Sequence, residues 1–155
     1  MAISPTLQKF LNDNAIAYEV LSHSPTATSL NSAHAAHIPG NKMAKPVILE
    51  DEDGYLMAVI PANEHVKIRE LNHSLKRNVG LATERELYRL FSDCVIGAIP
   101  PVGAAYGMQT VVDDSLLQCD DVYFEAGDHE ELIHVKGVSF RKMMAHSQHA
   151  RLCTH

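Results

Sequence analysis

Tryptophan is absent from this 155-residue chain, and all aromatic residues together make up only 6% of it. So few rings argue against a binding surface built mainly on base stacking. Cysteine is also scarce: there are three, without CxxC spacing, which argues against a disulfide scaffold and fits a reducing compartment. No apolar run approaches the roughly 18 residues of a membrane span. The sequence does not open on a basic segment followed by an apolar block, so we expect no secretory signal and a cytoplasmic protein.

Positive charge is in short supply as well. Thirteen Lys and Arg residues face 19 Asp and Glu residues, which gives a formal net charge of −6. Proteins that hold nucleic acid mainly through a basic surface have the opposite balance. Any nucleic-acid partner must therefore be bound through a local basic patch, with modest affinity. Hydrophobic residues make up 46% of the chain, as expected for a globular domain with its own core.

The common motifs of hydrolases and nucleotide-binding proteins are also missing. There is no GxSxG, Walker A or GxGxxG sequence. Ten histidines are present, and two pairs, His34 with His37 and His146 with His149, have helical spacing. No HExxH motif or Cys/His cluster with zinc spacing accompanies them, so we expect no metal and no cofactor. A metal-dependent hydrolase remains an alternative that metal analysis of the purified protein would reveal.

Helical and strand patterns mix along the chain without a regular βαβ alternation. Ser4 and Pro5 favour the start of a helix, and Thr83 with Glu86 has the spacing of a capping box. The predicted helices cover 5–14, 28–36, part of 64–76, a segment beginning at Thr83, and 139–147. The predicted strands cover 16–21, 45–50, 55–60, 79–83, 108–113, 121–127 and 132–137. We expect one α+β domain over residues 1–155, with a mixed, mostly antiparallel sheet surrounded by helices and a frayed tail from about 147.

Two side chains in apolar strands are candidates for chemistry. Lys45 stands at the start of the predicted strand 45–50, where its stem can pack on the sheet while its ammonium group enters a cleft. A compact positive charge there suits a phosphate or a polarised carbonyl, although an ordinary solvent-facing lysine gives the same pattern. His134 lies in "LIHVKG", and its ring can face either the core or a cleft.

The stretch "GAIPPVG", from Gly97 to Gly103, follows an apolar segment and is bracketed by glycines. Glycine allows backbone N–H groups to approach a ligand closely, and proline fixes the shape of the loop in advance. Because Pro100 and Pro101 have no N–H group, donors must come from the other loop residues. These are Gly97, Ala98, Ile99, Val102 and Gly103. A tight turn that only crosses the core is the structural alternative.

Four pieces of the sequence, in their order, resemble the YbaK and prolyl-tRNA synthetase-associated editing-domain family. They are "SHSPTATS…MAKPVIL", "YLMAVIPA", "GAIPPVG" and "DVYFEAGDHEELIHVKG", and the resemblance spans roughly residues 5–145. Lys45 matches the lysine that opens a strand in this family. Gly97 with Pro101 matches its GxxxP loop, which Gly103 closes. No single motif is very specific, but the ordered set is.

The resemblance implies a trans-acting hydrolase that cleaves the ester of mischarged aminoacyl-tRNA, with the acceptor end of the tRNA as its partner. It implies catalytic roles for Lys45, Gly97 and Gly103. We further expect Ala98, Ile99, Pro101, Val102 and His134 to contribute to substrate binding, although a structural role in the core is the alternative for His134. Weak association with a synthetase and no membrane contact are further expectations. The family is described as relying on positioned water and the terminal ribose hydroxyl, which fits a sequence without an evident general base.

A non-catalytic module that binds tRNA ends, nucleotides or a protein in the same cleft is the alternative function. The sequence does not identify the amino acid removed, and alanine, cysteine, serine and threonine esters all stay open. Oligomeric state is not readable from the sequence either.

Overall fold

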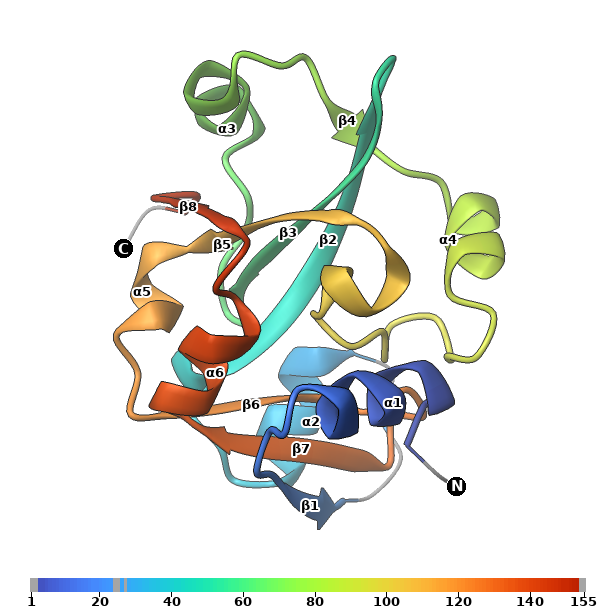
Figure 1. Cartoon of the computed structure of the whole chain (residues 1–155), viewed down its shortest axis with the longest axis vertical. Helices are drawn as coiled ribbons and strands as arrows, with labels where there is room; N and C mark the ends of the chain where they lie inside the picture. The colour runs from blue at the N-terminus through green and yellow to red at the C-terminus, as the bar shows by residue number, and fades with distance from the viewer. Residues whose placement is uncertain (1–2, 24–25, 27, 154–155) are drawn as a thin grey trace.

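A single mixed sheet with helices on both faces forms the protein, as the sequence predicts (Figure 1). The computed structural model describes residues 3–23, 26 and 28–153. Its helices are α1 (Pro5–Asp13), α2 (Ser29–Ala35), α3 (Ile68–Leu75), α4 (Glu84–Leu90), α5 (Asp114–Leu117) and α6 (Gly137–Met143), with short 3-10 turns η1 (Gly40–Lys42) and η2 (Gly103–Tyr106). Its strands are β1 (Glu19–Ser22), β2 (Met43–Asp51), β3 (Gly54–Pro61), β4 (Gly80–Leu81), β5 (Gln109–Asp113), β6 (Asp121–Glu125), β7 (Glu131–Lys136) and β8 (Gln148–Ala150).

The strand order is β1-β7-β6-β2-β3-β5-β8, with β4 added to β2. Within the described residues, four strand pairs are antiparallel and three are parallel. The long hairpin of β2 and β3 runs through the middle of the molecule, with β6, β7 and β1 at its lower end in Figure 1 and α3 and β4 near its tip. The α+β class and the mixed sheet are therefore confirmed.

Two helices, α1 and α4, begin where the sequence predicts, whereas α6 begins two residues before the predicted start and α5 was not predicted. Ser4 caps α1 by accepting a hydrogen bond from the Leu7 N–H, at 3.2 Å. Thr83 and Glu86 form the predicted capping box of α4, because each side chain accepts a hydrogen bond from the other's backbone N–H. No helix in the described part of the chain is long and apolar enough to cross a membrane.

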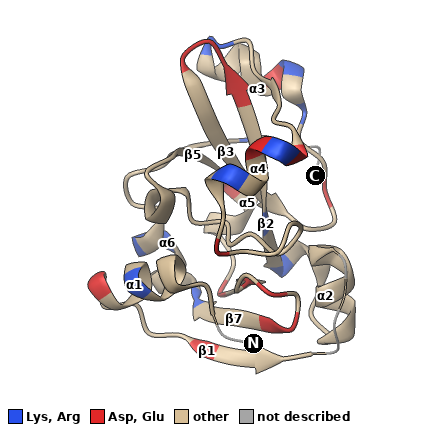
Figure 2. Cartoon of the chain, turned by 90° about the vertical axis from the view of Figure 1, so that its right-hand side faces the viewer, with Lys and Arg blue, Asp and Glu red and all other residues tan. Residues whose placement is uncertain are grey.

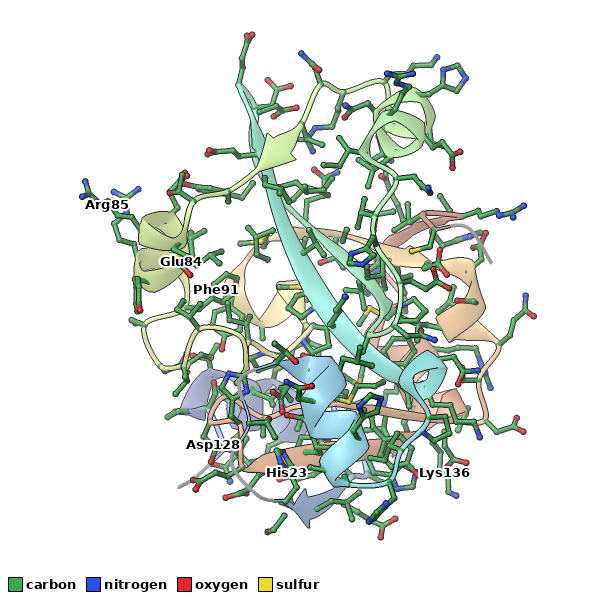
Figure 3. All side chains as sticks on the ribbon, turned by 180° about the vertical axis from the view of Figure 1, so that it is seen from behind. His23, Glu84, Arg85, Phe91, Asp128 and Lys136 are labelled. Atoms are coloured by element: carbon green, nitrogen blue, oxygen red, sulfur yellow. The ribbon has the colours of Figure 1, made fainter. Side chains whose placement is uncertain are left out.

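Two hydrophobic clusters cover the two faces of the sheet near β6 and β7. Leu7 of α1 and Phe140 of α6 pack on one face, together with Ile133. Ala33 of α2 packs on the other face with Leu132. Figures 1 and 3 show α6 and α2 on opposite sides accordingly. Because successive residues of a strand face opposite sides, the neighbours Leu132 and Ile133 serve different clusters.

The C-terminal segment is not frayed, and that expectation was wrong. Residues 148–150 form β8, which pairs in parallel with β5. Leu152 and Cys153 are fully buried, and the Leu152 N–H donates to the buried Asp113 carboxylate at 2.7 Å. Burial of two apolar side chains and pairing of the backbone hold the segment in place through residue 153.

One edge of β2 is open in the middle, and this gap positions the candidate site. On the side away from β3, β2 pairs with β6 at Met43 and Ala44 and with β4 at Leu49 and Glu50. No strand pairs with this edge between these positions in the described chain. Pro46 lies in the gap, where a residue without an N–H group leaves no ladder donor unpaired.

Candidate active site

A pocket of about 490 Å³ lies at the gap in the sheet, within the size range of small-molecule sites. Four segments form its wall besides β2. They are the start of α2, the residues after β3, the first turns of α4, and the stretch 96–99. The apolar part of the lining consists of Leu30, Pro46, Ile48, Ala62, Leu87, Ile96 and Ile99. The pocket is thus mainly apolar, with a few polar groups that can orient a ligand.

Lys45 is the lysine that lines this pocket, and its side chain is half-buried. Its Nζ atom donates a hydrogen bond to the Ala62 carbonyl at 3.0 Å. Burial lowers the pKa of Lys45, while Cys153 and Glu64 act in the opposite direction. The geometry therefore holds a cation at the pocket with two of its three donors free of that carbonyl bond.

Gly97 and Ile99 bring the predicted loop to the same pocket. The backbone of Gly97 has a φ of +92°, which L side chains rarely adopt, so a glycine is needed at this position. No described residue accepts a hydrogen bond from the Gly97 N–H, whereas the Ala98 N–H is bonded to the Val95 carbonyl at 3.0 Å. Lys45 and Gly97 thus line the same pocket, and Gly97 brings to it a backbone N–H group with no acceptor among the described residues.

The other loop residues pack inside the protein instead of lining the pocket. Ala98, Pro101 and Val102 are buried, and none of them is among the pocket residues. Gly103 is buried in η2, where a Cβ atom would lie 2.1 Å from the Thr110 hydroxyl oxygen. These residues shape the loop from behind, and the structure does not bring them to a ligand in this pocket.

His134 lies outside the pocket, so the structure does not bring it together with Lys45 and Gly97. Its ring stacks on Tyr123 with a centroid distance of 4.5 Å. Its two ring nitrogens face the carboxylates of Glu19 and Asp121, at 3.1 and 2.8 Å. Alternation puts His134 on the same face of β7 as Leu132 and Lys136, next to its cross-strand neighbour Tyr123 of β6.

Sequence reasoning missed several polar residues of the pocket. They are Thr28 and Ser29 from the start of α2, Asn63 and His65 from the segment after β3, and Glu84 from α4. Figure 3 labels Glu84 on α4, with the neighbouring Arg85 pointing away from the body of the protein. Only the spacing of the capping box marked Glu84 as the first residue of a helix. In the described chain, no three His, Cys, Asp or Glu side chains are grouped to hold a metal ion.

A second group of polar side chains is buried behind the pocket loop. Glu125, at the end of β6, is fully buried and accepts a hydrogen bond from the Ser32 hydroxyl at 3.2 Å. Its carboxylate also faces His129 at 2.8 Å and His23 at 3.8 Å. Burial raises the pKa of Glu125 to about 7, although Ser32 and His23 oppose the shift. Figure 3 labels His23 and, in the segment after β6, Asp128.

The raised pKa of Glu125 predicts a pH-dependent stability. A carboxyl whose pKa rises on folding contributes stability that is complete below pH 4.5 and is lost as pH rises through about 7. Relative to Glu125→Gln, the wild type should therefore lose up to about 3 kcal/mol of unfolding free energy across this range. Denaturant unfolding at pH 4.5 to 8 measures the difference.

The control is Glu19→Gln, which removes a carboxylate that also faces a histidine but is 71% exposed. Its stability curve should run parallel to that of the wild type. If the stability curve of Glu125→Gln also runs parallel to that of the wild type, the pKa of Glu125 is not raised by folding, and the prediction is wrong.

A model of the aminoacyl-tRNA editing domain matches residues 23–143. The chain belongs to the aminoacyl-tRNA editing domain family. The match spans most of the chain, including Lys45, the loop at Gly97 and the Glu125 cluster. No curated protein matches the sequence.

Solved structures of editing-domain shape superpose on nearly the whole chain. One is described as a candidate trans-editing enzyme for prolyl-tRNA synthetase, with 19% identity and a TM-score of 0.84, covering 99% of this chain and 100% of that one. Another is the hypothetical protein APE2540, at 22% identity and a TM-score of 0.84, covering 96% and 99%. A third, from Marinobacter aquaeolei VT8, is described as a candidate signal transduction protein, at 23% identity and a TM-score of 0.80. This chain, 97% covered, spans only 30% of that longer one. At these identities the superpositions establish the fold alone.

Proposed function

We propose that this editing domain is a trans-acting deacylase that hydrolyses the ester of mischarged aminoacyl-tRNA. The observation that carries the proposal is the pairing, in one pocket, of the Lys45 ammonium group with the exposed Gly97 backbone. Water attacks the ester carbonyl, and the tetrahedral intermediate collapses to a free amino acid and a tRNA with its terminal hydroxyl restored. The Gly97 N–H stabilises the developing oxyanion, and Lys45 holds the terminal phosphate or the ester carbonyl.

The pocket lining supports selection by size. Leu30, Leu87 and Ile99 present apolar walls, and the available volume is about 490 Å³. Such a pocket must hold the amino-acid side chain together with part of the terminal ribose. A small aminoacyl group fits this arrangement, and a larger correct amino acid is excluded by contact with the walls.

A panel of charged tRNAs tests the function directly. Alanine, cysteine, serine and threonine esters are incubated with the protein, with a correctly charged prolyl-tRNA as comparison, and loss of the ester is followed over time. Deacylation of one or more small esters above the uncatalysed rate supports the proposal. Binding without cleavage of any ester identifies the domain as a binding module and overturns it.

Binding of tRNA should be weak and should fall with salt. The net charge is −6, and the tip of the β2–β3 hairpin is acidic in Figure 2, while α4 carries charges of both signs. Arg77 is already held by the Asp51 carboxylate at 2.7 Å. Lys67 and Arg85 are exposed next to the pocket residues His65 and Glu84, so they are the cations to test.

Replacing both Lys67 and Arg85 by glutamine should lower the slope of log affinity against log salt by about 0.7 to 0.9 for each phosphate that is no longer neutralised. Lys9→Gln is the control, because the Lys9 ammonium group is paired with Asp13 on α1 at 2.6 Å. The salt slope is measured by filter binding from low to high salt. Affinity that does not change with salt would contradict this description of the interface.

A further inference from the structure

The buried cluster behind the pocket is bonded directly to the pocket loop. The His129 Nε2 atom lies 3.0 Å from the Ile96 carbonyl oxygen, and its Nδ1 atom lies 2.8 Å from the Glu125 carboxylate. A second bond joins the same segments, because the Val95 N–H donates to the Gly127 carbonyl at 2.8 Å. Two hydrogen bonds therefore fasten the loop before Gly97 to the segment that follows β6.

His129 is held in an unusual backbone conformation. Its φ is +63°, in the left-handed region that residues other than glycine rarely adopt. Both ring nitrogens have partners, and the side chain is 8% exposed. Strain of this kind persists only where the surrounding contacts fix it, and it is concentrated at functional sites.

The peptide between Ile96 and Gly97 carries the effect into the pocket. A trans peptide is planar, so its C=O and N–H groups point in opposite directions. The Ile96 carbonyl points at His129, and the N–H of the same peptide, which belongs to Gly97, points away from it. Gly97 is exposed and lines the pocket. A hydrogen bond on the buried side thus sets the direction of the donor on the substrate side.

We propose that His129, held by Glu125, is a positioning residue that fixes the Ile96–Gly97 peptide so that the Gly97 N–H faces the substrate. This inference rests on the proposed deacylase function, but the orientation of the peptide can be measured without any substrate.

The position of one proton controls this arrangement. A carbonyl oxygen only accepts, so His129 must carry a proton on Nε2 to hold Ile96. A second proton is shared between His129 Nδ1 and the Glu125 carboxylate. Whichever of these two groups carries it, His129 keeps its first proton on Nε2. Once that proton is lost, a neutral imidazole can keep its remaining proton on Nδ1, facing the carboxylate. The Nε2 lone pair then faces the Ile96 carbonyl, and the bond that holds the loop is lost.

The surroundings of Glu125 place this loss near neutral pH. Burial and the nearby Asp128 raise the pKa of Glu125, the Ser32 hydroxyl and His23 lower it, and the result is about 7. Orientation of the Gly97 N–H should therefore weaken as pH rises through this value. Glu125→Gln removes the dependence, because its amide can donate to Nδ1 at any pH and keep the proton on Nε2.

Two substitutions of His129 separate its contacts. Gln places an amide nitrogen near the position of Nε2 and can still bond to Ile96, whereas Asn reaches only the position of Nδ1 and Glu125. We expect His129→Asn to lower the single-turnover deacylation rate roughly tenfold, part of the 100- to 1,000-fold that complete loss of such a donor costs. His129→Gln should recover most of the rate, and substrate affinity should change little in both. The exposed pair of His149 and Asp114 supplies His149→Gln as the control.

The ¹⁵N–¹H resonance of the Gly97 amide gives the independent measurement. It should shift in His129→Asn but not in His149→Gln, and in the wild type it should titrate near pH 7. The titration of the Gly97 resonance should vanish in Glu125→Gln. If neither His129 variant folds, this variant still tests the inference. Equal rates for the Asn and Gln variants, or a Gly97 resonance that ignores both pH and Glu125→Gln, would overturn the inference. If the resonance responds but the wild type cleaves no ester, the proposed function fails and the positioning role stands.

Discussion

Replacing Lys45 by methionine is expected to lower the single-turnover deacylation rate by about 100-fold while the protein stays folded. Methionine keeps an apolar stem of similar length and removes the charge, so packing on β2 survives and the cation in the pocket does not. Positioning of a reacting group can be worth several kcal/mol, and each 1.4 kcal/mol corresponds to a factor of ten in rate. The hydrogen bond from Lys45 to the Ala62 carbonyl is lost at the same time.

Arginine at position 45 separates charge from shape. It keeps the positive charge, but its planar fork replaces a compact ammonium group in a half-buried position. We expect Lys45→Arg to recover only part of the rate. Lys9→Met on α1 controls for loss of an exposed lysine. A wild-type rate for Lys45→Met, on an ester that the wild type clearly cleaves, would remove Lys45 from the mechanism.

Lys45 and Gly97 could be found from the sequence because each stands out against its neighbours. Lys45 opens an apolar strand, and Gly97 opens a loop whose prolines cannot donate hydrogen bonds. His134 looked similar, but alternation along β7 does not decide whether it is exposed, because the fully buried Leu132 lies on the same face as His134 and Lys136. The ring nitrogens of His134 face Glu19 of β1 and Asp121 of β6, and this pairing of strands was not visible in the sequence.

The Glu125 cluster could not be predicted, because its members meet only in three dimensions. Glu125 and His129 are four residues apart, but they face one another because the chain turns at Gly127 and His129 adopts a positive φ. His23 and Ser32 arrive from segments about a hundred residues earlier. Nothing in the sequence "EAGDHEE" (125–131) reveals that Glu125 is buried or that the backbone of His129 is strained. The parallel pairing of β8 with β5 was hidden for the same reason.

The two glycines that bracket the loop should respond to valine in opposite ways. Gly97 lines the pocket at a φ of +92°, so valine forces the Ile96–Gly97 peptide to turn and adds bulk beside the substrate. Loss of one well-aimed oxyanion donor costs about 100- to 1,000-fold in rate. Gly97→Val should therefore lose activity by about this factor, with a smaller loss of melting temperature.

Gly103→Val should lose stability instead. A Cβ atom at Gly103 would lie 2.1 Å from the Thr110 hydroxyl oxygen and 3.0 Å from the Met108 carbonyl oxygen, and both atoms are in or next to β5. Overpacking a buried site of this kind costs roughly 1 to 3 kcal/mol or more. The molecules that still fold should turn over normally, because Gly103 does not line the pocket.

Gly107→Val is the matched control for backbone strain. Its φ of +65° is also in the left-handed region, and a Cβ atom there meets nothing within 4 Å. It should therefore show a strain-related fall in melting temperature comparable to that of Gly97→Val, with a normal single-turnover rate. Melting curves and rates for the three variants, each expressed per folded molecule, separate the effects. If Gly97→Val behaves like Gly107→Val, the loop serves only to cross the core, and the oxyanion donor must be sought elsewhere in the pocket.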